Sequence, residues 1–507
     1  MRALIMIGET GQLTFYDEVG QRLERMGFEI SLCCDRDDPG VADAVNDVAT
    51  RHNFGFFVLR ENFSLETLTA NVPICNTSTN ALTSTVTPAK PTERVANELH
   101  VVVKKLKSYA TKLFYYFLPS NGAKIESQQL QHEVNYHRAY HRVRKLESEK
   151  LFVDRHVDIL ILGEDGIGSN LWAISSAKHL GIRVVVIPYG MAYSNFLVQK
   201  GLIQKQAEDD LITVDALGGR VVKKNFPNWI KNSNFGEVLY FRPSYIIALE
   251  KEGIKLRDPW CLQGGEADII LSEGLEMSDR YILEGVPKDK LMITGSIYSD
   301  VLFDHIHADK KLKAAFNRNT VISKKELRVL VCVPPSESVF WSQNARFSTL
   351  SEFYSSFSRK MKNYVGVKLT YSFHPRLADK IRQELITIGI YPSELAVFNL
   401  IANNDLVIMH NSSLCRWAIQ AKKPVINYDF YGFGTNYFPD CDGYYFTRKL
   451  KSFLTQLDKI ILGEIKYETL SIGCNQKAER MGIFDGRCAE RMADEIKKIS
   501  SETEKQI

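Results

Sequence analysis

The sequence has no long hydrophobic run and no marked excess of one charge. Nowhere do its 507 residues approach the roughly 20 consecutive apolar residues that cross a bilayer, and the apolar run at 2–8 is too short for a signal peptide. The 64 basic and 60 acidic residues nearly cancel, which argues against binding nucleic acid through a large basic surface. We therefore expect a cytoplasmic protein without a nucleic-acid partner.

Closely spaced metal-binding motifs are also missing. The nine cysteines, including the adjacent Cys33 and Cys34, show no pair with the spacing of a zinc site or a redox motif. His137 and His141 lie one helical turn apart but lack the flanking carboxylate of an H-E-x-x-H motif. The sequence predicts reduced thiols, no metal and no cofactor.

Two series of short apolar segments alternate with segments of helical periodicity. Continuous apolar strands that alternate with helices are typical of parallel sheets covered on both faces. We therefore predict an α/β protein with two Rossmann-like domains facing a cleft, with a helical insertion in the first domain. The predicted strands are 3–7, 28–33, 54–59, 157–162, 182–187 and 269–271, followed by 329–333, 367–373, 406–409 and 425–427.

The same pattern divides the chain. We expect a first Rossmann-like domain over 1–295 with its insertion at about 61–150, a linker over 296–326, a second Rossmann-like domain over 327–470, and a C-terminal helix over 471–507 that returns to the first domain. Within the insertion, 101–118 combines four lysines with a Phe/Tyr/Leu face. Two interpretations stay open: peripheral contact with the inner face of the membrane, or a helix whose aromatic residues pack on the core.

Acidic residues follow one of the buried strands. Glu164 and Asp165 come directly after 157–162 and precede Gly166 and Gly168. Open α/β sheets bind ligands at the carboxyl ends of their strands, so either carboxylate is a candidate general base. The alternative is that Asp165 only caps the next helix.

Two motifs in the second half also follow predicted strands. His374 and Arg376 flank Pro375, and imidazole with guanidinium suits a phosphate group. Asn411, Ser412 and Ser413 precede a helical segment, where hydroxyl and amide groups are suited to holding a phosphate. A strand-end cap at His374 and a plain serine N-cap are the structural alternatives.

Four segments of the sequence, two of which contain the residues of the last paragraph, resemble GT-B nucleotide-sugar glycosyltransferases of bacterial surface-polysaccharide biosynthesis, a group similar to UDP-N-acetylglucosamine 2-epimerases. The resemblance implies that the first domain binds the acceptor and the second the nucleotide sugar. A narrower likeness is to bacterial sialyltransferases, which have an acidic-acidic-Gly motif, an HP motif and a Ser-Ser/Thr motif in the same order. The segments are ADIILSEG…GVPKDKLMITGSIYSD, FHPR, DLVIMHNSSLCRWAIQAKKPVINYD and FDGRCAERMADEI.

The resemblance implies a metal-independent, inverting transfer from a CMP- or UDP-linked sugar to a glycan or lipid-linked acceptor. Asp165 or Glu164 would be the base, His374 would assist the leaving phosphate, and Arg376, Asn411, Ser412 and Ser413 would hold the donor. Pro334-Pro335-Ser336 stands where the epimerases have a His-Arg pair, which weakens the epimerase alternative. An epimerase, a phosphotransferase and a catalytically silent carbohydrate-binding relative remain as alternatives.

Overall fold

The computed structural model describes residues 1–35, 39–59, 122–166, 168–192, 194–336, 347 and 349–504. Residues 60–121, which include the segment 101–118, lie outside these residues. The chain forms two compact units, one of residues 1–60, 145–211 and 256–507, and one of residues 61–144 and 212–255. Among the described helices, none is long and apolar enough to cross a membrane.

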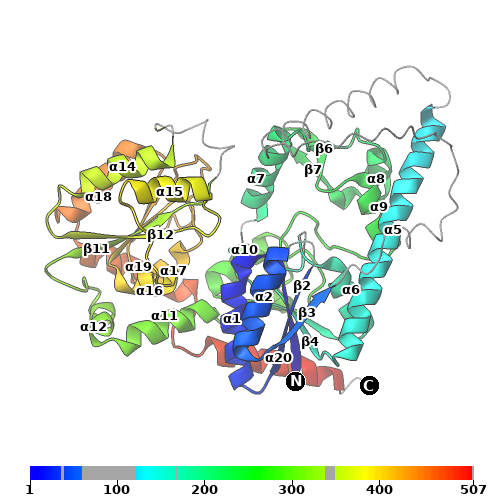
Figure 1. Ribbon diagram of the computed structural model, residues 1–507, viewed down its shortest axis with the longest axis horizontal. Coiled ribbons are helices and arrows are strands. Elements are labelled where there is room, and N and C mark those ends of the chain that lie inside the picture. The colour runs from blue at the N-terminus through cyan, green and yellow to red at the C-terminus, as the bar shows by residue number, and fades with distance from the viewer. Residues whose placement is uncertain are drawn as a thin grey trace, which may run out of the picture. The chain divides into compact units, whose positions relative to one another are not determined.

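The first unit contains a parallel sheet of seven strands in the order β10-β9-β5-β4-β1-β2-β3 (Figure 1). The chain runs outward from β1 to β3 and then returns to place β4 on the other side of β1, with Ala3 opposite both Ile30 and Ile159. The order therefore reverses between β1 and β4. The strands are β1 (Arg2–Ile7), β2 (Glu29–Asp35), β3 (Gly55–Leu59), β4 (Ile159–Leu162), β5 (Arg183–Val186), β9 (Ile269–Ser272) and β10 (Leu291–Ile293).

A second parallel sheet in the same unit has five strands in the order β12-β11-β13-β14-β15. Here the order reverses between β11 and β13, since β12 pairs with the opposite edge of β11. The prediction of an α/β protein with two parallel Rossmann-like sheets is confirmed. The strands are β11 (Leu327–Val333), β12 (Val367–Phe373), β13 (Leu406–Met409), β14 (Val425–Tyr428) and β15 (Tyr444–Thr447).

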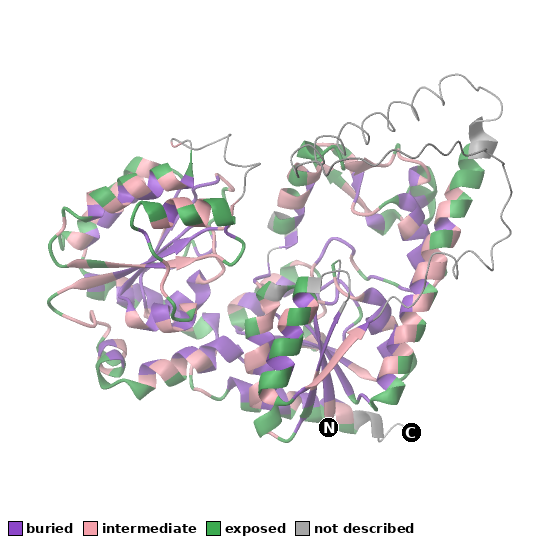
Figure 2. Ribbon diagram, in the orientation of Figure 1, coloured by how far each residue is buried: buried purple, intermediate pink, exposed green. Residues whose placement is uncertain are grey.

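Helices connect the strands, and the central strands are buried almost throughout (Figure 2). Burial on both faces explains why β4 and β13 are uninterrupted apolar runs and show no alternating pattern. The helices of this unit include α1 (Thr10–Arg25), α2 (Pro39–His52), α6 (Leu171–His179), α7 (Ser194–Ala207), α10 (Leu275–Leu283), α14 (Leu350–Met361), α15 (Asp379–Thr387), α16 (Val397–Asn403), α17 (Cys415–Gln420), α18 (Leu450–Ile461) and α19 (Tyr467–Met481).

The segment between the two sheets is helical. It forms α11 (Ile297–Ala308) and α12 (Lys310–Arg318), capped by the side chains of Ser296 and Asp309. The chain ends its described part with α20 (Cys488–Glu504), which packs against α1 and α11. Lys497 of α20 donates a hydrogen bond to the Met26 carbonyl oxygen at 3.2 Å, so this helix lies on the first sheet's side of the unit.

The second unit combines the first part of α5 (Gly122–Asp154) with a small antiparallel sheet of three strands. Glu252 accepts hydrogen bonds from Arg138 and Arg142, which fastens α5 to the end of α9. The sequence analysis did not identify 212–255 as part of the insertion, because its strands are only two to four residues long. The elements are β6 (Ile212–Thr213), α8 (Gly219–Asn225), β7 (Ile230–Ser233), β8 (Gly236–Leu239) and α9 (Pro243–Lys251).

Candidate functional site

Two glutamates follow the strands at which the order of the first sheet reverses. Glu9 follows β1 and Glu164 follows β4, and such a reversal point is where open α/β sheets bind ligands. Burial raises the pKa of Glu164 to about 8, and the nearby carboxyl groups of Glu9 and Asp165 contribute. Gly168, at φ +93°, leaves room for this carboxyl group, since a Cβ there would lie 3.0 Å from Glu164 Oε1.

Tyr189 connects these glutamates with the second sheet. Its hydroxyl group donates a hydrogen bond to Glu9 Oε1. Burial raises the pKa of Tyr189 above its usual range, with contributions from Glu9 and Glu164, whereas Arg376 lowers it. The phenol therefore stays neutral and lies within electrostatic reach of groups from both sheets. The sequence analysis missed Tyr189, although its position just after a predicted strand was a usable signal.

Asp165 has a different environment from its neighbour Glu164. It is 1% exposed, and its two carboxylate oxygens accept hydrogen bonds from the main-chain N–H groups of Gly265 and Ala267 at 3.1 and 2.8 Å. A Cβ at Gly265 would lie 1.8 Å from the Asp165 carbonyl oxygen, so only glycine allows this approach. Asp165 thus fastens the loop before β9 to the end of β4. It does not cap α6, whose N-cap is Asn170.

His374 and Arg376 follow β12 in the second sheet. His374 Nδ1 accepts a hydrogen bond from the Arg376 main-chain N–H at 3.1 Å, so the proton of the neutral ring is on Nε2. Burial lowers the pKa of His374 to about 4, with Arg376 and Lys200 contributing. The imidazole is therefore a neutral Nε2–H donor beside two cations, an arrangement that can bind a phosphate oxygen.

Asn411, Ser412 and Ser413 follow β13. Asn411 has a left-handed backbone at φ 49°, and its amide is fully engaged with Asn427 and Asp429. Ser412 Oγ accepts a hydrogen bond from the Leu414 N–H at 3.3 Å. Asn411 thus shapes the turn, while the two serines form its surface before α17.

Two buried residues that the sequence analysis did not single out hold this turn. Asn427 Oδ1 accepts the Asn411 main-chain N–H at 2.8 Å. Asp429 accepts the main-chain N–H groups of Phe433 and Gly434 at 2.9 and 2.6 Å, in addition to the Asn411 amide. Both come from the end of β14, so the turn after β13 is fixed by the strand beside it.

The structure brings the predicted residues together in part. β11 lies between β12 and β13, so His374 and Arg376 are separated from Ser412 and Ser413 by two strand spacings, roughly 9 to 10 Å. No described contact joins the two groups directly. Tyr189 is hydrogen-bonded to Glu9, and two charged groups act on its pKa, which Glu164 raises and Arg376 lowers.

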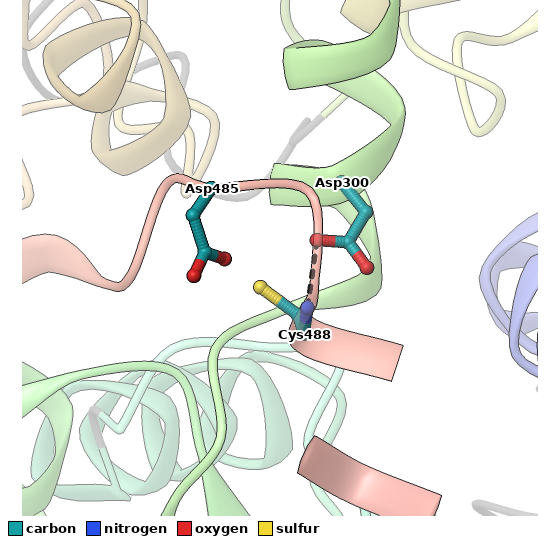
Figure 3. A group of neighbouring side chains, drawn as sticks. All are labelled: Asp300, Asp485 and Cys488. Carbon is teal, nitrogen blue, oxygen red and sulfur yellow. Dashed lines mark hydrogen bonds between the residues drawn. The ribbon is translucent and has the colours of Figure 1, made fainter. Parts of the chain in front are cut away.

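A possible cation site lies elsewhere, where Asp300, Asp485 and Cys488 come together (Figure 3). Asp300 is buried, and its two oxygens accept the first N–H groups of α20, from Cys488 and Ala489, both at 2.9 Å. Asp485 is paired with both terminal nitrogens of Arg491 at 2.9 Å. These bonds explain the group as a helix cap next to an ion pair.

No family model and no curated protein matches the chain. Among solved structures, the UDP-GlcNAc 2-epimerase of Neisseria meningitidis bound to UDP-GlcNAc matches with a TM-score of 0.50 at 11% identity, over 98% of this chain and 100% of that one. A Listeria monocytogenes protein assigned as a UDP-N-acetylglucosamine 2-epimerase matches with a TM-score of 0.50 at 12% identity, over 99% and 97%. The chain therefore shares the two-domain fold of these proteins, and identity this low establishes the fold alone.

Proposed function

We propose that the protein is a glycosyltransferase that moves a sugar from a nucleotide donor to a hydroxyl group of a glycan or lipid-linked acceptor in surface-polysaccharide synthesis. The observation that carries the proposal is that carboxyl groups follow strands of the first sheet, whereas imidazole and guanidinium groups follow a strand of the second. The carboxyl groups are those of Glu9 and Glu164, and the other two groups are those of His374 and Arg376. A transferase needs a base on the acceptor side and cationic groups on the leaving phosphate.

In this proposal Glu164 removes the proton from the acceptor hydroxyl as its oxygen attacks the anomeric carbon. The bond from that carbon to the phosphate oxygen breaks, and the nucleotide leaves with the electron pair. A buried carboxyl group with a pKa of about 8 is a stronger base, once ionised, than an ordinary glutamate. Asp165, the other predicted base, has the supporting role of holding the strand end on which Glu164 lies.

The donor phosphates bind at the second sheet in this proposal. His374 Nε2–H and the Arg376 guanidinium contact one side, and the Ser412 and Ser413 hydroxyl groups contact the other, with the end of β11 between them. The fixed cations near His374, from Arg376 and Lys200, neutralise the charge that builds up on the leaving group. For this reason we propose a reaction that requires no divalent cation.

An epimerase acting on the same nucleotide sugars is the second candidate. It is favoured by the presence of two carboxyl groups, Glu9 and Glu164, at one reversal point, since inverting a carbon centre requires one group to remove a proton and another to return it. An epimerase also shares the fold of this chain, as the comparison with the Neisseria protein shows.

One series of measurements separates the candidates. CMP-, UDP- and GDP-sugars are first screened by thermal shift, because a ligand that binds only the native state raises the melting temperature. The best donor is then incubated alone and with a panel of glycan acceptors. Release of nucleotide that depends on an acceptor supports the transferase, a changed sugar without nucleotide release supports the epimerase, and binding without either product contradicts both.

A further inference from the structure

Arg416 is the second residue of α17 and is almost completely buried, at 1% exposed. It directly follows the turn of Ser412 and Ser413, and its main-chain N–H bonds to the Ser413 carbonyl oxygen at 3.4 Å. The side chain extends from α17, which belongs to the second sheet's connections, to residues that follow β5 and β9 of the first sheet. Its Nη2 atom donates to the Tyr189 carbonyl oxygen at 2.8 Å and lies 2.9 Å from Glu273 Oε1.

The guanidinium of Arg416 packs on an aromatic ring, but two of its three nitrogen atoms have no hydrogen-bond partner among the described residues. Its central carbon lies 3.9 Å from the centre of the Trp417 ring, in a stacked cation–π contact. Its Nε and Nη1 atoms are buried without a hydrogen-bond partner in the described part of the chain. Unsatisfied buried donors are rare and costly in folded proteins, so an arginine in this state indicates a function beyond stability.

Glu273, the partner of Arg416, is 5% exposed and follows β9. Burial raises its pKa to about 7, and Arg416 opposes this shift. Replacing a buried ion pair by apolar side chains is often neutral or stabilising, so the pair is not explained by stability alone. Its geometry instead connects one helix of the second sheet to the ends of β5 and β9.

Tyr189 extends this connection to the glutamates. Arg416 donates a hydrogen bond to the Tyr189 carbonyl oxygen, and the Tyr189 hydroxyl group donates one to Glu9. The Tyr189 hydroxyl group is also close enough to Glu164 for that carboxyl group to raise the pKa of Tyr189. A displacement of the serine turn moves the start of α17, because the N–H groups of Cys415 and Arg416 bond to Ser412 and Ser413. The hydrogen bond from Arg416 to the Tyr189 carbonyl oxygen would carry such a displacement to Tyr189.

We propose that Arg416 is a positioning residue that couples occupation of the Ser412–Ser413 turn to the placement of Tyr189 and Glu164. The inference rests on the proposed function in assigning the turn to the donor phosphates. Two nitrogen atoms of the guanidinium have no hydrogen-bond partner among the described residues. Binding at the turn shifts α17 and draws Tyr189, with Glu9 and Glu164, into the position in which Glu164 meets the acceptor.

The first test needs no ligand. Hydrogen–deuterium exchange is measured on the full chain for peptides that cover 187–192, in the wild type and in the double variant Arg416→Met with Glu273→Gln, which leaves no buried unpaired charge. Ser299→Ala is the matched control. It removes the other buried hydrogen bond of α17, from Ser299 to Gln420 Oε1 at 2.6 Å, without touching β5 or β9.

We expect exchange over 187–192 to increase about ten-fold in the double variant, as for the loss of one net hydrogen bond, and to stay near the wild-type rate in Ser299→Ala. Arg416→Lys, which keeps the charge but loses the planar fork, should give an intermediate increase. Unchanged exchange in the double variant overturns the inference, whatever the protein binds.

The second test adds CMP, UDP or GDP to the same proteins. In the wild type, a nucleotide that protects 411–415 should also protect 187–192, and in Arg416→Lys the protection should remain at 411–415 alone. Protection of both segments in both proteins overturns the coupling. If no nucleotide protects 411–415, the proposed function fails, and the ligand-free exchange still decides the role of Arg416. With a donor that is turned over, Arg416→Lys should lower kcat about ten-fold with an unchanged nucleotide Kd.

Discussion

The main-chain N–H of Ala267 donates a 2.8 Å hydrogen bond to the buried carboxylate of Asp165, across 102 residues of sequence. This bond gives two adjacent acidic residues different environments. Asp165 is fixed by the loop before β9, whereas Glu164 accepts no such bonds from the described residues and lies among other titratable groups. Sequence position alone made them equivalent candidates.

The first prediction contrasts these two residues. Asp165→Asn should lower the melting temperature, because the amide has only one oxygen for the two main-chain N–H groups of Gly265 and Ala267. The N–H group that loses its acceptor should lower the free energy of unfolding by about 1 to 3 kcal/mol. Glu164→Gln should not lower the melting temperature, and it should keep the nucleotide affinity while turnover falls at least about 100-fold, as for removal of a general base. Calorimetry and a turnover assay check both. Full turnover in Glu164→Gln would rule out its role as base.

The second prediction concerns the pH dependence of turnover. The pKa of Glu164 is raised to about 8 by burial, and only the ionised carboxylate accepts a proton. We expect kcat/KM to rise with pH and to level off above about 8. His374 does not contribute a falling limb above pH 5, since its pKa is lowered to about 4. A profile that is flat between pH 6 and 9 would exclude Glu164 as the base.

The third prediction concerns stability. The native state holds the Glu164 proton more tightly than the unfolded chain, because the pKa rises from 4.5 to about 8 on folding. The unfolded state therefore binds fewer protons between these values, and the free energy of unfolding should fall as pH rises from about 4.5 to 8. Glu164→Gln should show a smaller fall over this range. Denaturant unfolding at pH 5 and pH 8 measures the difference, and equal slopes for the two proteins would contradict the burial of this carboxyl group.

The fourth prediction concerns the donor. His374→Ala, and separately the pair Ser412→Ala with Ser413→Ala, should weaken binding of the best nucleotide about ten-fold or more, because each loses a charge-assisted phosphate contact of about 1.5 to 3 kcal/mol. Calorimetric titration measures the affinities. His410→Gln is a useful comparison, because His410 is buried among aromatic rings with Nδ1 bonded to the Tyr428 carbonyl oxygen. It should lower stability more than affinity. Unchanged affinity in both site variants would place the phosphates elsewhere.

The fifth prediction separates a helix cap from a metal site. Asp300→Ala should destabilise the protein by about 1 to 2 kcal/mol, since the first N–H groups of α20 lose their acceptors. EDTA should leave the melting temperature of the wild type unchanged, because Arg491 already neutralises Asp485. A drop in melting temperature with EDTA that zinc or magnesium reverses would show that a cation binds here.

The fold was predictable because both sheets consist of buried parallel strands, whose apolar runs are visible without alternation. Segments with weak hydrophobic periodicity were less clear. We expected a linker over 296–326 from its charged, weakly periodic residues, and the structure has α11 and α12 there, of which α12 buries only Leu312 and Ala315. The short strands β6 to β8 were missed because two to four residues carry too little pattern.

The candidate site was predictable where chemistry-bearing residues directly follow a strand, as Glu164, His374 and Ser412 do. Roles that depend on distant contacts were not visible. The role of Asp165 depends on its hydrogen bonds with Gly265 and Ala267, about 100 residues away in the sequence. The role of Arg416 depends on its hydrogen bond with Tyr189, 227 residues away. Nothing local marks an arginine in a short helix as a connection between two sheets.

Helix α20 has a consequence for how the chain is made. Its residues leave the ribosome after both sheets, yet they pack against α1 and form bonds to Asp300 and to the carbonyl oxygen of Met26. The first sheet and its helices therefore cannot complete their packing while they are being synthesised. They complete it only after the second sheet and α20 have left the ribosome. Nascent chains stalled before about residue 484 should thus expose apolar surface on α1, and molecular chaperones would meet the first sheet in that state.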